Sequence, residues 1–363
     1  MLLSLATAHN KPEFLRKQGN FFMRISATKL LRGTANAIAL LALPVVLILV
    51  SAIVGAYPVS VSSIWSAILH PLLPSIAVPD QQAYILLTQV RFPRILAAAL
   101  VGSGLAIAGS VFQAIFRNPL SSPYTLGVSN GAGFGAALGI LIGGSAWLVQ
   151  ISAVVWALIA IALTFALSSR SHGSTVTLLL SGMLVGSLFA SLVSLIKFVA
   201  DPYEKLPQII FWLMGSLSTV SLSQVLSIIP LYLLALALIF GLRWRLTVLS
   251  FDEDFARSFG VDTRRDLALS VVAASALAAA VVSIAGIVGW IGVVVPHFAR
   301  MLVGADLRKV LPTSISLGAS FMLLIDLIAR SAGAVEIPIG VLTGIVGIPL
   351  FLWLIHRGKV RFL

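Results

Sequence analysis

Long apolar stretches recur along this chain and limit what it can fold into. A helix needs about 20 apolar residues to cross the hydrocarbon core of a bilayer. The clear candidates are 34–57, 92–116, 145–169, 175–198, 223–242, 268–285, 311–329 and 338–356, and the shorter candidates are 127–143 and 287–303. The sequence therefore predicts an all-α, polytopic membrane protein with about ten transmembrane helices.

Composition agrees with a chain that spends most of its length in lipid. Of its 363 residues, 59% are hydrophobic and 10% are charged, whereas a soluble domain carries about 25% charged residues. The absence of cysteine excludes disulfides, cysteine-ligated zinc and iron–sulfur clusters. A net charge of +12 would suggest nucleic acid as the partner of a soluble protein. In a chain surrounded by membrane lipid it indicates cytoplasmic loops rich in Lys and Arg, and no nucleic-acid partner.

The distribution of basic residues predicts the orientation. An even number of spans places both termini on one side, and 19 of the 24 Lys and Arg residues then lie on that side. This excess predicts cytoplasmic N- and C-termini. Residues 1–33 would form a cytoplasmic tail, 34–358 one transmembrane domain, and 359–363 a cytoplasmic C-terminus. The native chain would start at Met1 or at Met23.

Two stretches suggest how the helices are arranged. Gly131, Gly135, Gly139 and Gly143 recur every four residues and form a ridge of bare backbone on one helix face. Such a face lets helices approach closely in the membrane. The stretch 204–216 is too short and too polar at its start to cross, so we expect an interfacial or re-entrant helix.

The segment 250–266 concentrates charge between two apolar stretches. Ser250 and Glu253 have the spacing of a capping box, which predicts a helix start, and Gly260 can end that helix. Asp262 is expected to cap a second short helix that leads into the next span. The segment should therefore form two short helices at the cytoplasmic surface.

The faces of the first short helix differ in chemistry. Phe251, Phe255 and Phe259 recur every four residues and give an aromatic face, whereas Asp252, Glu253 and Arg257 lie elsewhere on the helix. Acidic residues in the first turn oppose binding to an anionic leaflet, because interfacial helices favour basic polar faces. A protein partner fits this helix better than a lipid surface.

Three arginines lie at the opposite, outer ends of spans. Arg91 and Arg94 belong to the sequence RFPR, and Arg330 ends the ninth predicted span. They can be snorkelling anchors or a docking site for an acidic partner, and the residues alone leave both open. Asp326 lies four residues before Arg330, so we favour a local ion pair over a functional intramembrane carboxylate.

The remaining motifs argue against catalysis by this chain itself. The loop FRNPLSSPYTLG, 116–127, is either an ordinary polar connection or a constriction at the cytoplasmic mouth. His297 has no partner at metal-ligand spacing, so no metal site is expected. No phosphate-binding loop and no nucleophile–base constellation is present. If this chain performs work, the energy must come from elsewhere.

The chain resembles a known family, the FecCD-type permeases of type II ABC importers, over about residues 34–358. The resemblance rests on ordered motifs, which include RFPR, GSGLAIAGSVFQAIFRNPLSSPYTLGVSNGAGFG, LLLSG, FWLMGSL, FDEDFARSFGV, GWIGVVVPHFARMLVGADLRKVLP, DLIAR and EIPIGVLTGIVGIPLFLWLI. It implies a ten-span permease in the cytoplasmic (inner) membrane of a bacterium or archaeon. The implied cargo is an iron–siderophore complex first, then haem or cobalamin, with an oxyanion such as molybdate also open.

The same resemblance implies partners. A second permease copy or close homologue would form the pathway with this chain. Two copies of an ATP-binding subunit would bind ATP and Mg on the cytoplasmic side, so this chain would bind no cofactor and would not be an enzyme by itself. A periplasmic or lipid-anchored binding protein would deliver the substrate.

The resemblance also implies roles for individual residues. The segment matching the ATPase-coupling helices contains Ser250, Phe251, Asp252, Glu253, Phe255, Ala256, Arg257, Phe259 and Gly260. Arginines matching Arg91, Arg94 and Arg330 meet glutamates of the binding protein. The cytoplasmic gate corresponds to Asn118, Leu120, Thr175 and Val176, although Val176 departs from the polar residue of the cobalamin member.

A competing interpretation is a secondary transporter driven by an ion gradient. Such a protein needs carboxylate or histidine relays near the membrane centre. Asp326 is the single candidate in the sequence, and it is expected near the end of a span. A channel or structural scaffold would leave the capped acidic helix unexplained.

Overall fold

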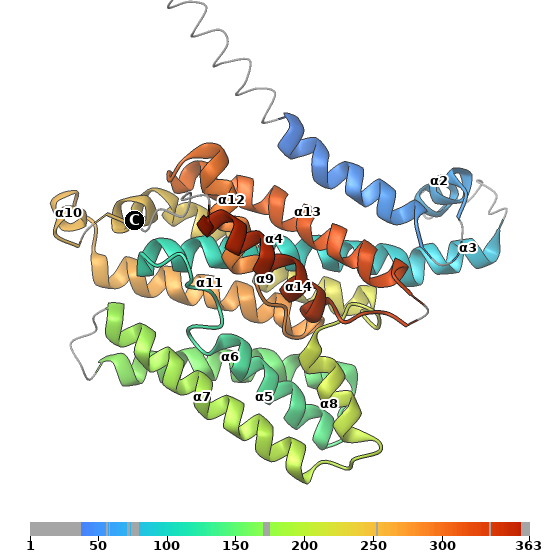
Figure 1. Cartoon of the computed structure of the whole chain (residues 1–363), viewed down its shortest axis with the longest axis horizontal. Helices are drawn as coiled ribbons and strands as arrows, with labels where there is room; N and C mark the ends of the chain where they lie inside the picture. The colour runs from blue at the N-terminus through green and yellow to red at the C-terminus, as the bar shows by residue number, and fades with distance from the viewer. Residues whose placement is uncertain are drawn as a thin grey trace, which may run out of the picture.

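The structure is a computed structural model that describes residues 38–356 apart from 56, 58, 71–72, 74–79, 170–174, 252 and 334. The predicted tail 1–33, the choice between Met1 and Met23, and the C-terminus 359–363 lie outside the described residues. Within the described part every regular element is helical, which confirms the all-α prediction (Figure 1).

The helices follow one another along the whole described chain. After the helix Ile38–Ile53, they are α2 (Val61–Leu69), α3 (Gln81–Ile85), the π-helix η1 (Leu86–Arg91), α4 (Phe92–Phe116), α5 (Val128–Leu141), α6 (Ala146–Ser169), α7 (Thr175–Val199), α8 (Lys205–Met214), α9 (Leu222–Leu249), α10 (Glu253–Ser258), α11 (Thr263–Ala285), α12 (Ile291–Val303), α13 (Leu307–Ser331) and α14 (Ile339–His356).

The number of apolar helices matches the prediction of about ten spans. Seven helices in the described part are long and apolar enough to cross a membrane, and the shorter apolar helices are Ile38–Ile53, Val128–Leu141 and Ile291–Val303. The stretch 204–216, predicted not to cross, contains the ten-residue α8.

Two helices form the centre of the bundle, and others cover them. The apolar parts of α4 and α11 are 83% and 78% buried, against 28% for α9 and 33% for α6 and α14. Figure 1 shows α5–α8 on one side of this centre and α12–α14 on the other, with α10 projecting at one end. Since α6, α9 and α14 leave most of their apolar surface uncovered within the chain, they are the surfaces available to lipid or to another subunit.

Glycines allow the central helices to touch backbone to backbone. A Cβ on Gly102 of α4 would lie 2.1 Å from the carbonyl oxygen of Gly318 in α13. The predicted ridge is confirmed for Gly131 and Gly135, where a Cβ would lie 2.6 and 2.3 Å from carbonyl oxygens of α6. Such close approach supplies the packing that holds helices together in lipid.

The second span differs from its predicted start at residue 92. The α3, η1 and α4 segments form one continuous helix, Gln81–Phe116, of 36 residues. In the π-helical turn the N–H of Phe92 donates to the carbonyl of Leu87, five residues earlier. Pro93 has no N–H and its ring crowds the preceding turn, so the widened turn lets the helix pass this proline without breaking. The arginines of RFPR therefore lie within a helix and not at its start.

Candidate functional site

The segment between α9 and α11 forms a short helix, as predicted, but with a different start. The predicted N-cap, Ser250, is instead the C-terminal cap of α9, and its hydroxyl donates to the carbonyl of Thr247 at 2.7 Å. The helix α10 begins at Glu253. The capping-box prediction missed that α9 runs through to Leu249, because its apolar pattern is continuous with the preceding span. Asp252 and the side chain of Glu253 lie outside the described residues.

The end of α10 agrees with the sequence, and the following helix agrees in part. Gly260 has φ +72°, and its N–H donates to the carbonyl of Arg257 at 2.9 Å. Asp262 caps the next helix by accepting from the N–H of Arg265 at 3.0 Å. That helix is α11 itself, which is continuous to Ala285, so the predicted separate second short helix is wrong.

The aromatic face predicted for this segment is present and open to solvent. Phe251, Phe255 and Phe259 are 63%, 44% and 54% exposed. Their rings lie next to one another in order, tilted by 56° and 49°, with centroids 5.5 Å and 4.8 Å apart. On the other face Ala256 is fully buried in a small cluster with Val248, Leu249 and Val261. This cluster seats α10 on the end of α9 and leaves the three rings facing outward.

Polar contacts tie the end of α9, directly before α10, to three other helices. The guanidinium of Arg117, directly after α4, donates to the carbonyl of Leu249 at 3.4 Å. The N–H of Leu307, at the start of α13, donates to the hydroxyl of Thr247 at 3.3 Å. Arg245 of α9 forms an ion pair of 2.9 Å with the buried carboxylate of Asp266 in α11. The end of α9, against which α10 packs, is therefore connected to α4, α11 and α13.

The predicted gate residues lie at helix ends. Asn118 accepts the N–H of Leu120 on its side chain at 2.9 Å, which forms a tight turn after α4. Leu120 is 51% exposed, and Val176, in the first turn of α7, is 67% exposed. Among the described residues, no hydrogen bond joins Asn118 or Leu120 to Thr175 or Val176. The gate role of these four residues stays a prediction.

The three predicted docking arginines converge, but their guanidinium groups are buried. Arg94 forms ion pairs of 2.7 Å with Asp326 of α13 and 2.7 Å with Glu336 of the α13–α14 loop. Both interpretations made from the sequence assumed exposed side chains, whereas the Arg94 side chain is 6% exposed. The expected Asp326–Arg330 pair is present at 3.6 Å, with Arg94 as the closer partner of Asp326.

The other two arginines hold the end of the first described helix. Arg91 donates to the carbonyls of Ala52, at 2.8 Å, and Tyr57. Arg330 donates to the carbonyl of Ser51 at 2.6 Å. The carbonyls of Ser51 and Ala52 lie in the last turn of the helix Ile38–Ile53, where carbonyls lack helical partners and the helix dipole also favours cations. Glu336 completes the cluster and was missed, because a single acid in a loop carries no signal of its own.

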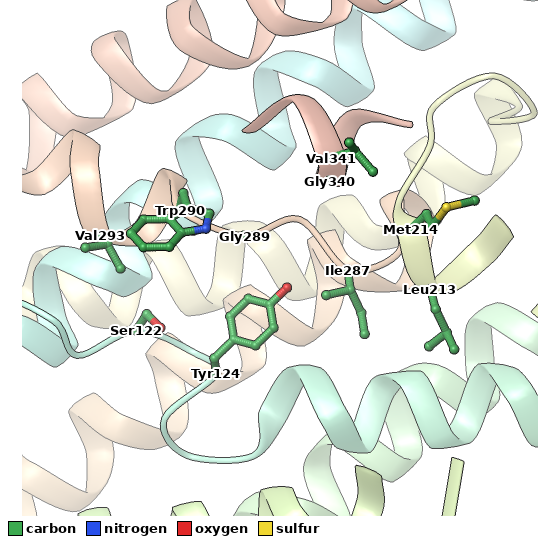
Figure 2. A pocket seen from close by; sticks show the side chains of 10 residues that line it. All are labelled: Ser122, Tyr124, Leu213, Met214, Ile287, Gly289, Trp290, Val293, Gly340 and Val341. Atoms are coloured by element: carbon green, nitrogen blue, oxygen red, sulfur yellow. The ribbon is translucent and has the colours of Figure 1, made fainter. Parts of the chain in front are cut away.

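A pocket of about 470 Å³ lies where helices end in the middle of the bundle. Figure 2 shows its lining side chains, which come from the α4–α5 loop, the end of α8, the α11–α12 connection and the starts of α12 and α14. The lining residues are Ser122, Tyr124, Leu213, Met214, Ile287, Gly289, Trp290, Val293, Gly340 and Val341. Sequence reasoning missed this pocket, although Tyr124 lies in the loop that was singled out as a constriction.

The described residues contain no group of three or more His, Asp or Glu that could hold a metal ion. The lining of the pocket also carries no acid, no histidine and no basic residue.

Comparisons with known proteins agree with this picture. The model of the FecCD transport family matches residues 42–357. The chain is 40% identical to a molybdate import permease of Haemophilus influenzae, over 84% of this chain and 90% of that protein. It is 37% identical to a probable iron chelatin permease of Helicobacter pylori strain 26695, over 76% and 83%.

A solved structure has the same architecture. It is a metal-chelate type ABC transporter in an inward-facing conformation, with a TM-score of 0.80 and 38% identity over 88% of this chain and 98% of that one. None of these matches supports the alternative of a secondary transporter. The protein belongs to the FecCD transport family of ABC transporter permeases.

Proposed function

We propose that this chain is the membrane-spanning subunit of an ABC importer, and that α10 is where an ATP-binding subunit docks. The single observation that carries the docking site is the exposed row of Phe251, Phe255 and Phe259, which lies on and directly beside α10, a helix anchored by buried Ala256. Exposed aromatic clusters on a rigid support are typical of protein interfaces. Two copies of the ATP-binding subunit would hold ATP and Mg, so the chain would not be an enzyme by itself.

The two candidate interaction sites support a transmembrane role because they lie at opposite ends of α4. Arg94 is in its first turn, and Arg117 directly follows its last residue. A helix of 25 residues is roughly 37 Å long, enough to cross the bilayer. We place α10 and both termini in the cytoplasm, and the arginine cluster on the outer side of a bacterial or archaeal inner membrane.

The proposed mechanism is a two-state movement of helices. Closure of the ATP-binding subunits would move α10, and the contacts of Arg117, Thr247 and Arg245 would pass that movement to α4, α13 and α11. A second permease copy would supply the other half of the pathway. The turn at Asn118 and Leu120, directly after Arg117, would then open or close as the gate together with Thr175 and Val176.

Substrate delivery is proposed at the arginine cluster. All three arginines of the cluster, Arg91, Arg94 and Arg330, already have hydrogen-bond or ion-pair partners within the chain. Glu336 is the most accessible acid of the cluster, with a side chain that is 40% exposed. A glutamate of a periplasmic or lipid-anchored binding protein would take its place on Arg94. The cargo would be a metal chelate, with iron–siderophore first, then haem or cobalamin, and an oxyanion as the further candidate because of the molybdate relative.

Co-purification with the ATP-binding subunit tests the docking site. Phe255→Ala and Phe259→Ala should each weaken association about thirtyfold, because an aromatic interface anchor contributes about 2 kcal/mol. Phe198→Ala is the matched control, since Phe198 is 86% exposed at the far end of α7. Association that survives both α10 substitutions would contradict the proposal. Uptake into vesicles that persists without ATP would instead favour a secondary transporter.

A further inference from the structure

The two helices that flank α10 carry an exposed surface with arginines at one end and apolar residues below them. We propose that this surface, which we call the α9–α11 face, binds an anionic phospholipid. Its phosphate would pair with the arginines, and its acyl chains would lie on the apolar residues. The face consists of Leu238, Gly241 and Arg245 of α9 and Arg265, Leu269 and Val272 of α11, all of them exposed.

The two halves of the α9–α11 face point the same way. On each helix its three members recur at intervals of three and four residues, which places them on one side of that helix. The opposite side of both helices packs against α4. Tyr232 of α9 shares a hydrogen bond of 2.8 Å with Ser103 of α4, and a Cβ on Gly104 of α4 would lie 2.8 Å from Val281 of α11. Because one helix backs both, the two exposed rows form a single surface.

The lower part of the α9–α11 face is apolar and open. Leu238, Leu269 and Val272 are 45%, 40% and 44% exposed. A Cβ on Gly241 would meet no atom within 4 Å, so the backbone of α9 is bare at this level. Trp244, 46% exposed, lies close to the arginine end, and exposed tryptophans gather at the membrane–water interface. The apolar residues therefore lie at the depth of the acyl chains, and the arginines lie at the depth of the headgroups.

Both arginines of the face have donors to offer. Arg245 uses one guanidinium nitrogen for its ion pair with Asp266 of α11, and 48% of its side chain is exposed. Arg265 is the residue next to Asp266, so the two guanidinium groups are attached at the same level of adjacent helices. Among the described residues no hydrogen bond or ion pair holds the Arg265 side chain, and the nearby Asp262 accepts its backbone N–H. Guanidinium groups in this arrangement suit a phosphate, which they bind through paired hydrogen bonds.

A phospholipid fits the whole α9–α11 face better than a protein does. A water-soluble subunit can reach Arg265 but not Val272, which lies seven residues, or roughly 10 Å, further along α11. A second copy of this chain that paired through the same face would bring arginine against arginine, which is unfavourable. An anionic phospholipid supplies a negative phosphate and apolar chains at the two required depths, and arginines at a membrane surface are attracted to such lipids.

Fluorescence quenching by spin-labelled lipid tests the site, because the chain has no native cysteine. Leu234→Cys, one turn from Leu238 and 60% exposed, would carry a bimane fluorophore beside the face without filling it. The full chain is placed in phosphatidylcholine nanodiscs that contain a rising fraction of one acyl-chain spin-labelled lipid. Labelled phosphatidylglycerol should quench the fluorophore at about fivefold lower mole fraction than labelled phosphatidylcholine, because the α9–α11 face concentrates the anionic lipid.

Charge variants in the same labelled chain assign the preference to the face. Arg265→Gln should raise the quenching mole fraction of phosphatidylglycerol about fivefold, which corresponds to about 1 kcal/mol for one arginine at an anionic surface. Arg265→Lys keeps the charge and should retain the preference. Arg308→Gln is the matched control, since Arg308 is an exposed arginine that is already paired with Asp306 at 2.9 Å.

Three results would overturn the lipid site. Equal quenching by the two lipids would show unselective contact with the bilayer. A preference that survives Arg265→Gln, or that Arg308→Gln removes equally, would place the anionic lipid elsewhere. Absence of quenching by either lipid would show that protein covers the α9–α11 face.

Discussion

The side-chain amide of Gln113 donates to the carbonyl oxygen of Gly292 at 3.1 Å and replaces a hydrogen bond that the sequence cannot make. In a regular helix that carbonyl would accept from residue 296, but Pro296 of α12 has no N–H. The same amide nitrogen donates to the carbonyl of Val293 at 3.1 Å. The side-chain oxygen of Gln113 accepts a hydrogen bond from Arg300. Gln113 of α4 thereby holds the first turn of α12, next to the pocket.

Substitution of Gln113 should destabilise the protein through the carbonyls it serves. Gln113→Glu keeps an acceptor for Arg300 and loses both N–H donors, so thermal unfolding should show a loss of about 1–3 kcal/mol for a buried unsatisfied group. Gln82→Leu is the control, because Gln82 is exposed in α3. If Gln113→Glu unfolds at the wild-type temperature, the amide is not needed to hold α12.

The α4–α12 contact makes a second prediction at Gly109. A Cβ there would lie 1.9 Å from the carbonyl oxygen of Gly292. Backbone atoms cannot move aside easily, so Gly109→Ala should push α4 and α12 apart. The free energy of unfolding should fall by several kcal/mol, or by about 1–3 kcal/mol if the two helices shift together. Gly241→Ala is the matched control, since a Cβ there would meet nothing within 4 Å and alanine favours the helix. Equal melting temperatures for the two variants would contradict the close contact.

The arginine cluster predicts unequal effects for its members. Arg94→Ala leaves the fully buried carboxylate of Asp326 with Arg330 alone at 3.6 Å, and breaking such a buried pair costs about 3–5 kcal/mol. Glu336→Gln should lower the free energy of unfolding by no more than about 1 kcal/mol, because the Glu336 side chain is 40% exposed. Chemical denaturation of the two variants in nanodiscs measures both values. A Glu336→Gln variant as unstable as Arg94→Ala would contradict this ranking.

The start of α13 should respond to pH through Asp306. Hydrogen bonds from the Arg308 side chain lower the pKa of this carboxyl below its ordinary value. A depressed folded-state pKa means that the stabilising contribution is present above the unfolded-state pKa and is lost as pH falls through the folded-state pKa. Asp306→Asn should therefore melt below the wild type at neutral pH, and the two should converge in strong acid. Melting curves measured from neutral to acidic pH test this, and a constant difference would contradict it.

Hydropathy and local turn chemistry determined much of this protein. The apolar stretches predicted the spans, because a bilayer imposes a length on every helix that crosses it, whatever its neighbours are. The aromatic face of α10, the cap at Asp262 and the turn at Gly260 were also predicted, since each depends on residues within one or two helical turns.

Packing decided which polar groups meet. Arg94 forms an ion pair with Asp326, 232 positions away in the sequence. Gln113 forms a hydrogen bond with the carbonyl of Gly292, 179 positions away. No local pattern specifies such pairs, because they depend on which helices lie together and at what rotation. The same holds for the buried state of the arginines and for the pocket around Trp290, which exists only where the ends of α8, α12 and α14 meet. In this chain the sequence determined which segments enter the membrane, and the tertiary structure decided the partners of the few polar groups they carry.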